Sequence, residues 1–242
     1  VYLFLAEELR ALQYTFQNGV SAGELIQVFA TTIDTAAWVV LLLLFELETS
    51  VLEDRRIHGW VRRGLHGTRA LCYVAIVYAF TGYYAEMVTL YEVSALSGPS
   101  ACDRLHEAWS VLVTLDKYVP LSPSNCASLG ASALQIDGFS ILAAPDVLQA
   151  ARWLAWTDVI NAGTWILVVV MLEVEVRLQL RRDLSDNIMH VTKFFKFALY
   201  AILFIAAAYW GIKGDFLDFW DASLWLFAFI FIELNVFDWQ QE

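Results

Sequence analysis

Apolar residues gather in five long blocks along the chain, separated by shorter polar stretches. The blocks cover roughly residues 25–47, 70–90, 154–174, 197–212 and 219–237. A helix that crosses a bilayer needs about 20 mostly apolar residues. The pattern therefore predicts an all-α fold, a polytopic transmembrane helix bundle with about five spans.

The polar stretches divide the chain into five predicted regions. Residues 1–20 mix apolar and charged residues at helical spacing, which is typical of an interfacial helix. Residues 21–91 and 145–212 each have the pattern of a transmembrane hairpin, and residues 213–242 that of a final transmembrane helix. Residues 92–144 are polar and rich in Ser, Gly and Pro, which predicts an extracytoplasmic loop region between the hairpins.

Basic residues give the expected orientation of the spans. Ten of the fifteen Lys and Arg residues lie in the two linkers that follow the first and third blocks: Arg55, Arg56, Arg62, Arg63, Arg69, Arg177, Arg181, Arg182, Lys193 and Lys196. Because short loops rich in Lys and Arg stay cytoplasmic, we expect the N-terminus outside and the C-terminus inside. The expected location is a plasma membrane, such as a bacterial inner membrane.

A short motif recurs in the first, third and fifth blocks. In each copy Asp or Asn is followed four residues later by Trp, and a Glu stands eight residues beyond that Trp. The copies are Asp34, Trp38 and Glu46; Asn161, Trp165 and Glu173; and Asp221, Trp225 and Glu233. The first two copies are 127 residues apart, and the same spacing maps Glu48 onto Glu175 and Arg69 onto Lys196. This predicts a parallel helical-hairpin repeat, related by an axis along the membrane normal.

Two interpretations of the repeat stay open at the level of sequence. Ionisable groups within a span usually face protein or water, and three glutamates at one depth would form an acidic ring that attracts cations. The candidate ion pathway is then Glu46, Glu173, Glu233, Asp34, Asn161 and Asp221. Alternatively, the glutamates lie about one turn from the cytoplasmic boundary, where nearby arginines would pair with them as structural anchors. Glu86, late in the second block, also has two interpretations: it pairs with Lys213, or it lines an outer vestibule.

Two of the three cysteines lie in the segment 92–144. In an exported segment Cys102 and Cys126 are expected to form a disulfide, with two free thiols as the alternative. Cys72 lies within the second block and is expected to pack in the helix bundle.

Composition and motifs exclude several classes of function. The chain is 59% hydrophobic and carries a formal net charge of −11, which argues against nucleic acid because phosphate binding needs a basic surface. The sequence contains no nucleophile elbow, P-loop, dinucleotide fingerprint or zincin motif, and its histidines lack metal-ligand spacing. We therefore expect no enzyme, no cofactor and no metal centre.

The preferred functional interpretation is a channel or transporter subunit that moves cations or protons along an acidic seam between the first, third and fifth spans. The alternative is a non-catalytic accessory subunit of a larger membrane complex, because the third copy of the hairpin lacks its second helix. Both interpretations expect lipid and a homo- or hetero-oligomeric partner. A membrane-embedded enzyme is the least favoured of the three.

Overall fold

The computed structural model is mostly helical and divides into two compact units, Val1–Trp156 and Thr157–Glu242. It describes residues 1–15, 25–48, 59–96, 100–130, 132–181 and 186–238. Side chains at residue 25 and in the ranges 175–190 and 232–238 lie outside that description. So do Arg55, Arg56 and Arg182, three of the residues behind the predicted orientation.

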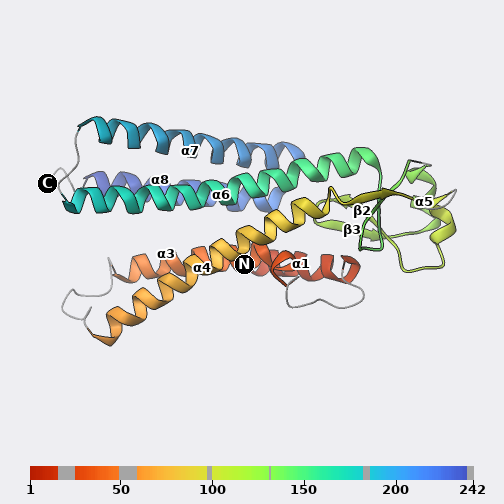
Figure 1. Ribbon diagram of the computed structural model, residues 1–242, viewed down its shortest axis with the longest axis horizontal. Helices are drawn as coiled ribbons and strands as arrows, with labels where there is room; N and C mark the ends of the chain where they lie inside the picture. The colour runs from red at the N-terminus through yellow and green to blue at the C-terminus, as the bar shows by residue number, and fades with distance from the viewer. Residues whose placement is uncertain (16–24, 49–58, 97–99, 131, 182–185, 239–242) are drawn as a thin grey trace. The chain divides into compact units, whose positions relative to one another are not determined.

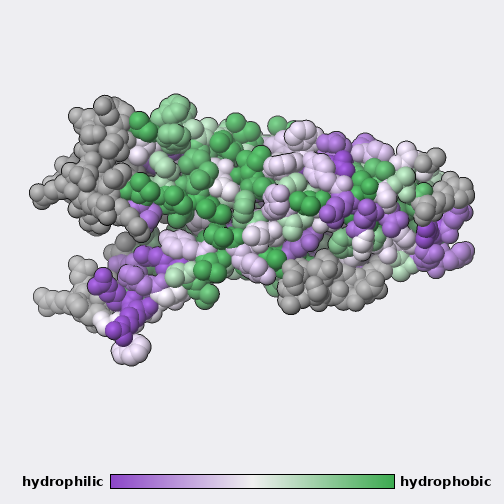
Figure 2. All heavy atoms as spheres, viewed as in Figure 1, coloured by the Kyte–Doolittle hydropathy of each residue, from purple (hydrophilic) through white to green (hydrophobic). Residues whose placement is uncertain are grey.

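Three helices in the described part of the chain are long and apolar enough to cross a membrane (Figure 1). They are α4 (Trp60–Thr89), the segment Pro145–Val174 of α6 (Pro145–Arg181), and the segment Val191–Lys213 of α7 (Asp186–Lys213). These segments contain the second, third and fourth predicted spans. Figure 2 shows apolar residues gathered over the helices, as expected of surfaces that face lipid.

The first and fifth predicted spans are also helical. The helix α3 (Ala30–Glu46) has 17 residues, and α8 (Phe216–Asp238) has 23. At 1.5 Å per residue α3 is about 26 Å long, slightly less than a hydrocarbon core of about 30 Å. A five-span topology therefore depends on these two helices and stays a prediction.

The first predicted span is interrupted near its start. A short helix α2 (Leu25–Val28) ends before Phe29, and α3 begins at Ala30. Gly82 of α4 lies against this interruption, because a Cβ atom at Gly82 would stand 2.5 Å from the carbonyl oxygen of Ile26. The absence of a side chain at Gly82 thus lets α4 approach the backbone of α2 closely.

Residues 93–143 form a small folded region, whereas the sequence predicted a loop. Its five strands are β1 (Val93–Ala95), β2 (Ser110–Thr114), β3 (Lys117–Pro120), β4 (Leu134–Ile136) and β5 (Ile141–Ala143). The sheet order is β1-β4-β5-β2-β3, with β2 and β5 parallel and the other pairs antiparallel. The predicted all-α fold class was therefore incomplete, because it did not include this sheet. Strands of three to five residues leave little alternation of polar and apolar residues for a sequence pattern to show.

A hydrophobic core holds this region together. The 3₁₀ helix η3 (Ala101–Arg104) and the helix α5 (Pro123–Leu129) pack beside the sheet, and a disulfide joins Cys102 to Cys126 with 5.0 Å between their Cα atoms. The side chains of Trp109, Val111 and Leu142 are buried in the same cluster. The bridge closes a segment of 24 residues, which restricts the unfolded chain.

The second unit packs through aromatic contacts. The rings of Trp165 on α6 and Phe229 on α8 lie 4.8 Å apart. The helix α7 packs against α8, and the two are joined by a tight turn in which Gly214 adopts a φ of 83°. That backbone conformation favours glycine, since other residues carry a Cβ that meets the backbone.

Candidate functional site

A pocket of about 80 Å³ lies within the first unit, between its helices and its sheet. Helix α1 (Tyr2–Thr15) forms one wall, the α2–α3 interruption and the end of α4 form a second, and the sheet forms the third. Its polar lining residues are Glu8, Thr15, Gln27, Thr31, Glu86, Thr89, Asp116 and Tyr118. The pocket is thus assembled from segments that are far apart in the sequence.

Side-chain hydrogen bonds connect the helical walls of this pocket. A carboxylate oxygen of Glu8 on α1 accepts from the backbone N–H of Thr32 at 3.1 Å, and the Thr32 hydroxyl donates to the other oxygen. The amide of Gln27 on α2 donates to the Thr89 hydroxyl on α4 at 3.2 Å. These bonds hold α1 against α3 and α2 against α4, so the pocket depends on all four helices.

The electrostatic character of the pocket is acidic. Among the described residues, its lining contains the carboxyl groups of Glu8, Glu86 and Asp116, and no Lys, Arg or His. Burial raises the pKa of Glu8 from 4.5 to about 7, although the hydrogen bonds from Thr32 oppose that rise. Glu8 therefore exchanges its proton near neutral pH, while the pocket as a whole favours a positive charge.

Tyr118 lies beside these carboxyl groups on β3. Burial, and then the negative charges of Glu86 and Asp116, raise the pKa of Tyr118 well above its usual range. The phenol stays protonated at neutral pH and offers both a donor and an acceptor to the pocket.

The three carboxyl groups are too far apart to hold one bare metal ion together. Within the described residues of the first unit, no three ligand atoms from His, Cys, Asp or Glu all lie within 4.8 Å of one another. Oxygen ligands of Mg²⁺ or Ca²⁺ stand about 2.0–2.6 Å from the ion, and so no more than about 5 Å apart. The pocket is therefore suited to protons, hydrated ions or larger cations.

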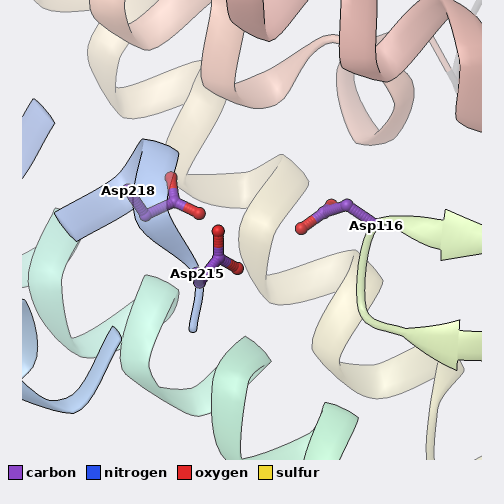
Figure 3. Close-up of side chains that lie close together, drawn as sticks. All are labelled: Asp116, Asp215 and Asp218. Atoms are coloured by element: carbon purple, nitrogen blue, oxygen red, sulfur yellow. The ribbon is translucent and has the colours of Figure 1, made fainter. Parts of the chain in front are cut away.

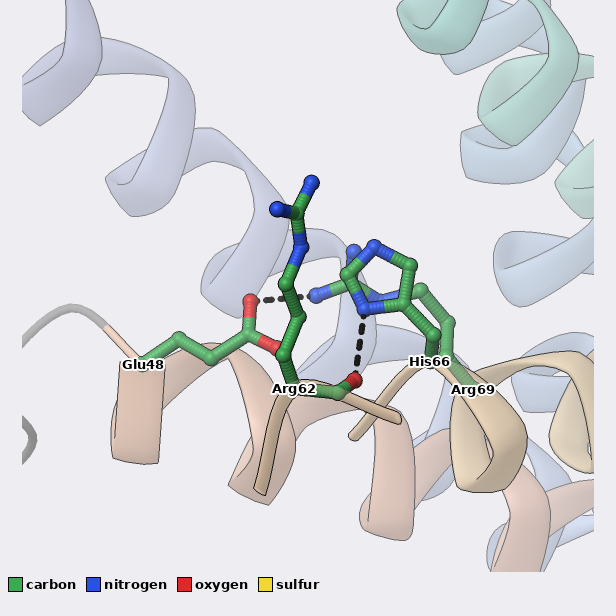
Figure 4. Close-up of polar contacts among 4 residues, drawn as sticks. All are labelled: Glu48, Arg62, His66 and Arg69. Carbon is green, nitrogen blue, oxygen red and sulfur yellow. Dashed lines mark hydrogen bonds and ion pairs between the residues drawn. The ribbon is translucent and has the colours of Figure 1, made fainter. Parts of the chain in front are cut away.

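The residues of the first repeat copy lie away from this pocket, along α3. The indole N–H of Trp38 donates to the carboxylate of Asp34 at 3.1 Å, one helical turn back. Glu46 is exposed near the end of the helix. Glu48 forms an ion pair with Arg69 at 2.5 Å, and a ring nitrogen of His66 donates to the carbonyl of Arg62 at 2.9 Å (Figure 4). The structural interpretation concerned Glu46 and its counterparts and not Glu48, so pairing of the repeat glutamates with arginine stays a prediction.

The second and third copies lie in the second unit. The Asn161 side-chain oxygen is buried without a hydrogen-bond partner, and Glu173 is exposed on α6. The carboxylate of Asp221 accepts a hydrogen bond from the Trp225 side chain. The side chains of Glu175 and Glu233 lie outside the described residues, so the predicted common level of the three repeat glutamates stays a prediction.

Asp116 of the pocket and two acidic residues of the second unit lie at or beside turns of the chain (Figure 3). In the first unit, Asp116 occupies the turn between β2 and β3. In the second unit, Asp215 precedes α8 and Asp218 lies in its first turn. Carboxylates at the start of a helix interact favourably with its dipole, which accounts for the latter two residues.

Comparison with known proteins supplied no further constraint on this site: no family model, curated protein or solved structure matches the chain.

Sequence reasoning did not single out Glu8, Asp116 or Tyr118. Glu8 lies on an amphipathic helix where charge is ordinary, and Asp116 lies in a turn where Asp is common. Glu86 was noted from the sequence, and Glu86 lines the pocket; a role in an outer vestibule stays a prediction. Only the fold brings Glu8, Glu86 and Asp116 to the same pocket.

Proposed function

We propose that this chain is an integral membrane channel or transporter subunit that moves cations or protons. The observation that carries this proposal is the pocket between α1, the start of α3, the end of α4 and the sheet, where the described lining residues supply three carboxyl groups and no basic side chain. Charge of one sign in a recess raises the local concentration of the opposite ion. The pKa of about 7 at Glu8 adds a group that can accept and release protons at neutral pH.

The proposed topology has five spans, with the N-terminus outside and the C-terminus in the cytoplasm. In that orientation the pocket lies at the outer ends of α3 and α4, where an ion would enter. The acidic seam of Glu46, Glu173 and Glu233 lies toward the cytoplasmic ends of the spans. Cysteine labelling from outside tests the orientation: Ser128→Cys should react and Trp60→Cys should not, and the reverse pattern would overturn it.

Ion flux into liposomes tests the proposed activity. The purified full-length chain should pass protons or monovalent cations. The double variant Glu86→Gln/Asp116→Asn should slow that flux about tenfold, because losing about 1.4 kcal/mol of cation stabilisation changes a rate tenfold. Asp103→Asn is the matched control, since Asp103 is an exposed acidic residue of the same sheet region that does not line the pocket.

Each outcome of the flux experiment has a separate meaning. Absence of flux in the wild-type chain would refute transport by this chain alone. Flux that is equal in the double variant and the control would remove the pocket from the pathway. The triple variant Glu46→Gln/Glu173→Gln/Glu233→Gln tests the seam in the same assay, and unchanged flux would leave those glutamates a structural role only.

An accessory subunit of a larger membrane complex is the second candidate function. The observation that favours it is the large exposed aromatic surface on α7, where Phe194, Phe197 and Phe204 are each more than two-thirds exposed. Such a surface suits another membrane helix as well as lipid. Co-purification of a defined partner in mild detergent, together with absence of flux, would support this function.

A further inference from the structure

The lining of the acidic pocket is apolar and aromatic between its carboxyl groups. Leu12, Leu115, Ile136 and Ile141 contribute aliphatic surface, and Phe139 and Tyr118 contribute rings. A hydrated inorganic ion gains nothing from such surface. A cation that carries its own apolar body gains from it by burial, and its charge gains from an aromatic face.

The size of the pocket limits the ligand. Its volume of about 80 Å³ is roughly half of the 150 Å³ that holds benzene in an engineered cavity. The space is sufficient for a few non-hydrogen atoms. Among the described residues of the first unit, no three carboxyl oxygens come together around one bare metal ion. The negative charges of Glu86 and Asp116 both act on the Tyr118 phenol, so these two carboxyl groups lie near one part of the pocket. An ammonium group carries several N–H donors and can contact two such acceptors.

We propose that this pocket binds a small primary ammonium ion, in which the charged nitrogen contacts Glu86 and Asp116 and the alkyl group contacts the apolar wall. This inference deepens the proposed function and rests on the same pocket, because it names the class of cation. The Tyr118 hydroxyl can accept a hydrogen bond from the ammonium group. The high pKa of Tyr118 keeps that hydroxyl neutral.

Isothermal titration calorimetry on the purified full-length chain, at constant ionic strength, tests this binding. Ethylammonium chloride is the probe, and ethanol is its neutral counterpart of the same size and shape. Sodium chloride and calcium chloride are the inorganic cations for comparison. Ethylammonium should bind saturably, ethanol should not bind, and the two inorganic salts should compete at least about tenfold more weakly.

Variants identify where the probe binds. Asp116→Asn and Glu86→Gln should each weaken ethylammonium binding about tenfold or more, since a hydrogen bond to a charged group is lost. The control Asp103→Asn should bind as the wild type does. The comparison of ethylammonium with ethanol uses only the wild-type chain, so it stays decisive if a variant does not fold.

Three results would overturn the proposal: no saturable binding of ethylammonium, equal binding of ethanol, or equally tight binding of sodium or calcium. An equal loss in Asp103→Asn would also overturn it, because the effect would then come from overall charge. Ethylammonium binding without any ion flux would keep this inference and refute the transport function. Ion flux without ethylammonium binding would keep the transport function and refute ammonium binding.

Discussion

The two segments that the sequence predicts as transmembrane hairpins, 21–91 and 145–212, have helices with different packing partners. In the first, α4 packs on α2 and α3 and brings Gly82 against the Ile26 backbone. The residue 127 positions later is Tyr209, whose ring holds the ammonium group of Lys213 at 5.5 Å. In the second, α7 packs on α8, where a Cβ at Gly211 would stand 3.1 Å from the Phe219 ring.

The same difference appears in the polar residues of the motif. Asp34 accepts a hydrogen bond from the indole of Trp38, whereas the side-chain oxygen of Asn161 is buried without a partner. Thr32, which donates to Glu8, corresponds to Val159 in the second hairpin. The spacing of 127 residues therefore aligns the Asp or Asn, Trp and Glu positions of the motif but not the polar group at Thr32, and the neighbours of each copy decide what its motif residues contact.

The largest expected effect is at Gly82. Gly82→Ala should destabilise the first hairpin by about 1–3 kcal/mol, because the new Cβ meets backbone atoms that cannot rotate away. Gly67→Ala on the same helix has open space and should stabilise it by about 0.5–1 kcal/mol. Unfolding midpoints in detergent measure both. Equal midpoints for the two variants would show that α4 does not approach α2 closely.

The next largest effect is a change in the stability of the first unit with pH, which comes from Glu8. The folded pKa of Glu8 is about 7 and its ordinary value is 4.5, so the folded state binds the proton more tightly. Its contribution to stability is complete below pH 4.5 and is lost as pH rises to about 7, at most about 3 kcal/mol. Glu8→Gln should flatten that part of the stability curve. A variant that keeps the wild-type slope would remove Glu8 as its source.

Double-mutant cycles test whether the first two copies of the motif differ in the hydrogen bond between their first polar residue and their Trp. Asp34→Ala combined with Trp38→Phe should give a coupling of about 1 kcal/mol, because their hydrogen bond is lost in either single variant. Asn161→Ala combined with Trp165→Phe should give a coupling near zero, since the Asn161 oxygen has no partner. Equal couplings in the two cycles would contradict the different geometry described for the copies.

The smallest expected effect is at the ion pair of Glu48 with Arg69. The two side chains are 24% and 34% exposed, so Arg69→Gln should cost less than about 1 kcal/mol. High salt should reduce the difference further by screening. Thermal unfolding of both proteins at low and high salt measures this, and a large loss that salt does not change would indicate a different role for Arg69.

The sequence by itself was sufficient to predict the helices that can cross a membrane. Long apolar blocks are local features, and a helix satisfies its own backbone hydrogen bonds within the span. The pairing of Cys102 with Cys126 could also be expected, since only two cysteines lie in the segment between the hairpins. The motif of Asp34 and Trp38 was visible for the same reason, because residues four apart lie on one helical face.

The sheet and the acidic pocket were decided only by the tertiary structure. Strands of three to five residues gain stability from pairing with distant segments, so β1 and β4 leave little trace in local pattern. Glu8, Glu86 and Asp116 are separated by up to 108 positions, which is the difference between 116 and 8. Their meeting depends on how α1, α4 and the sheet pack, because non-local contacts are set by the burial of whole surfaces and not by any single stretch of residues.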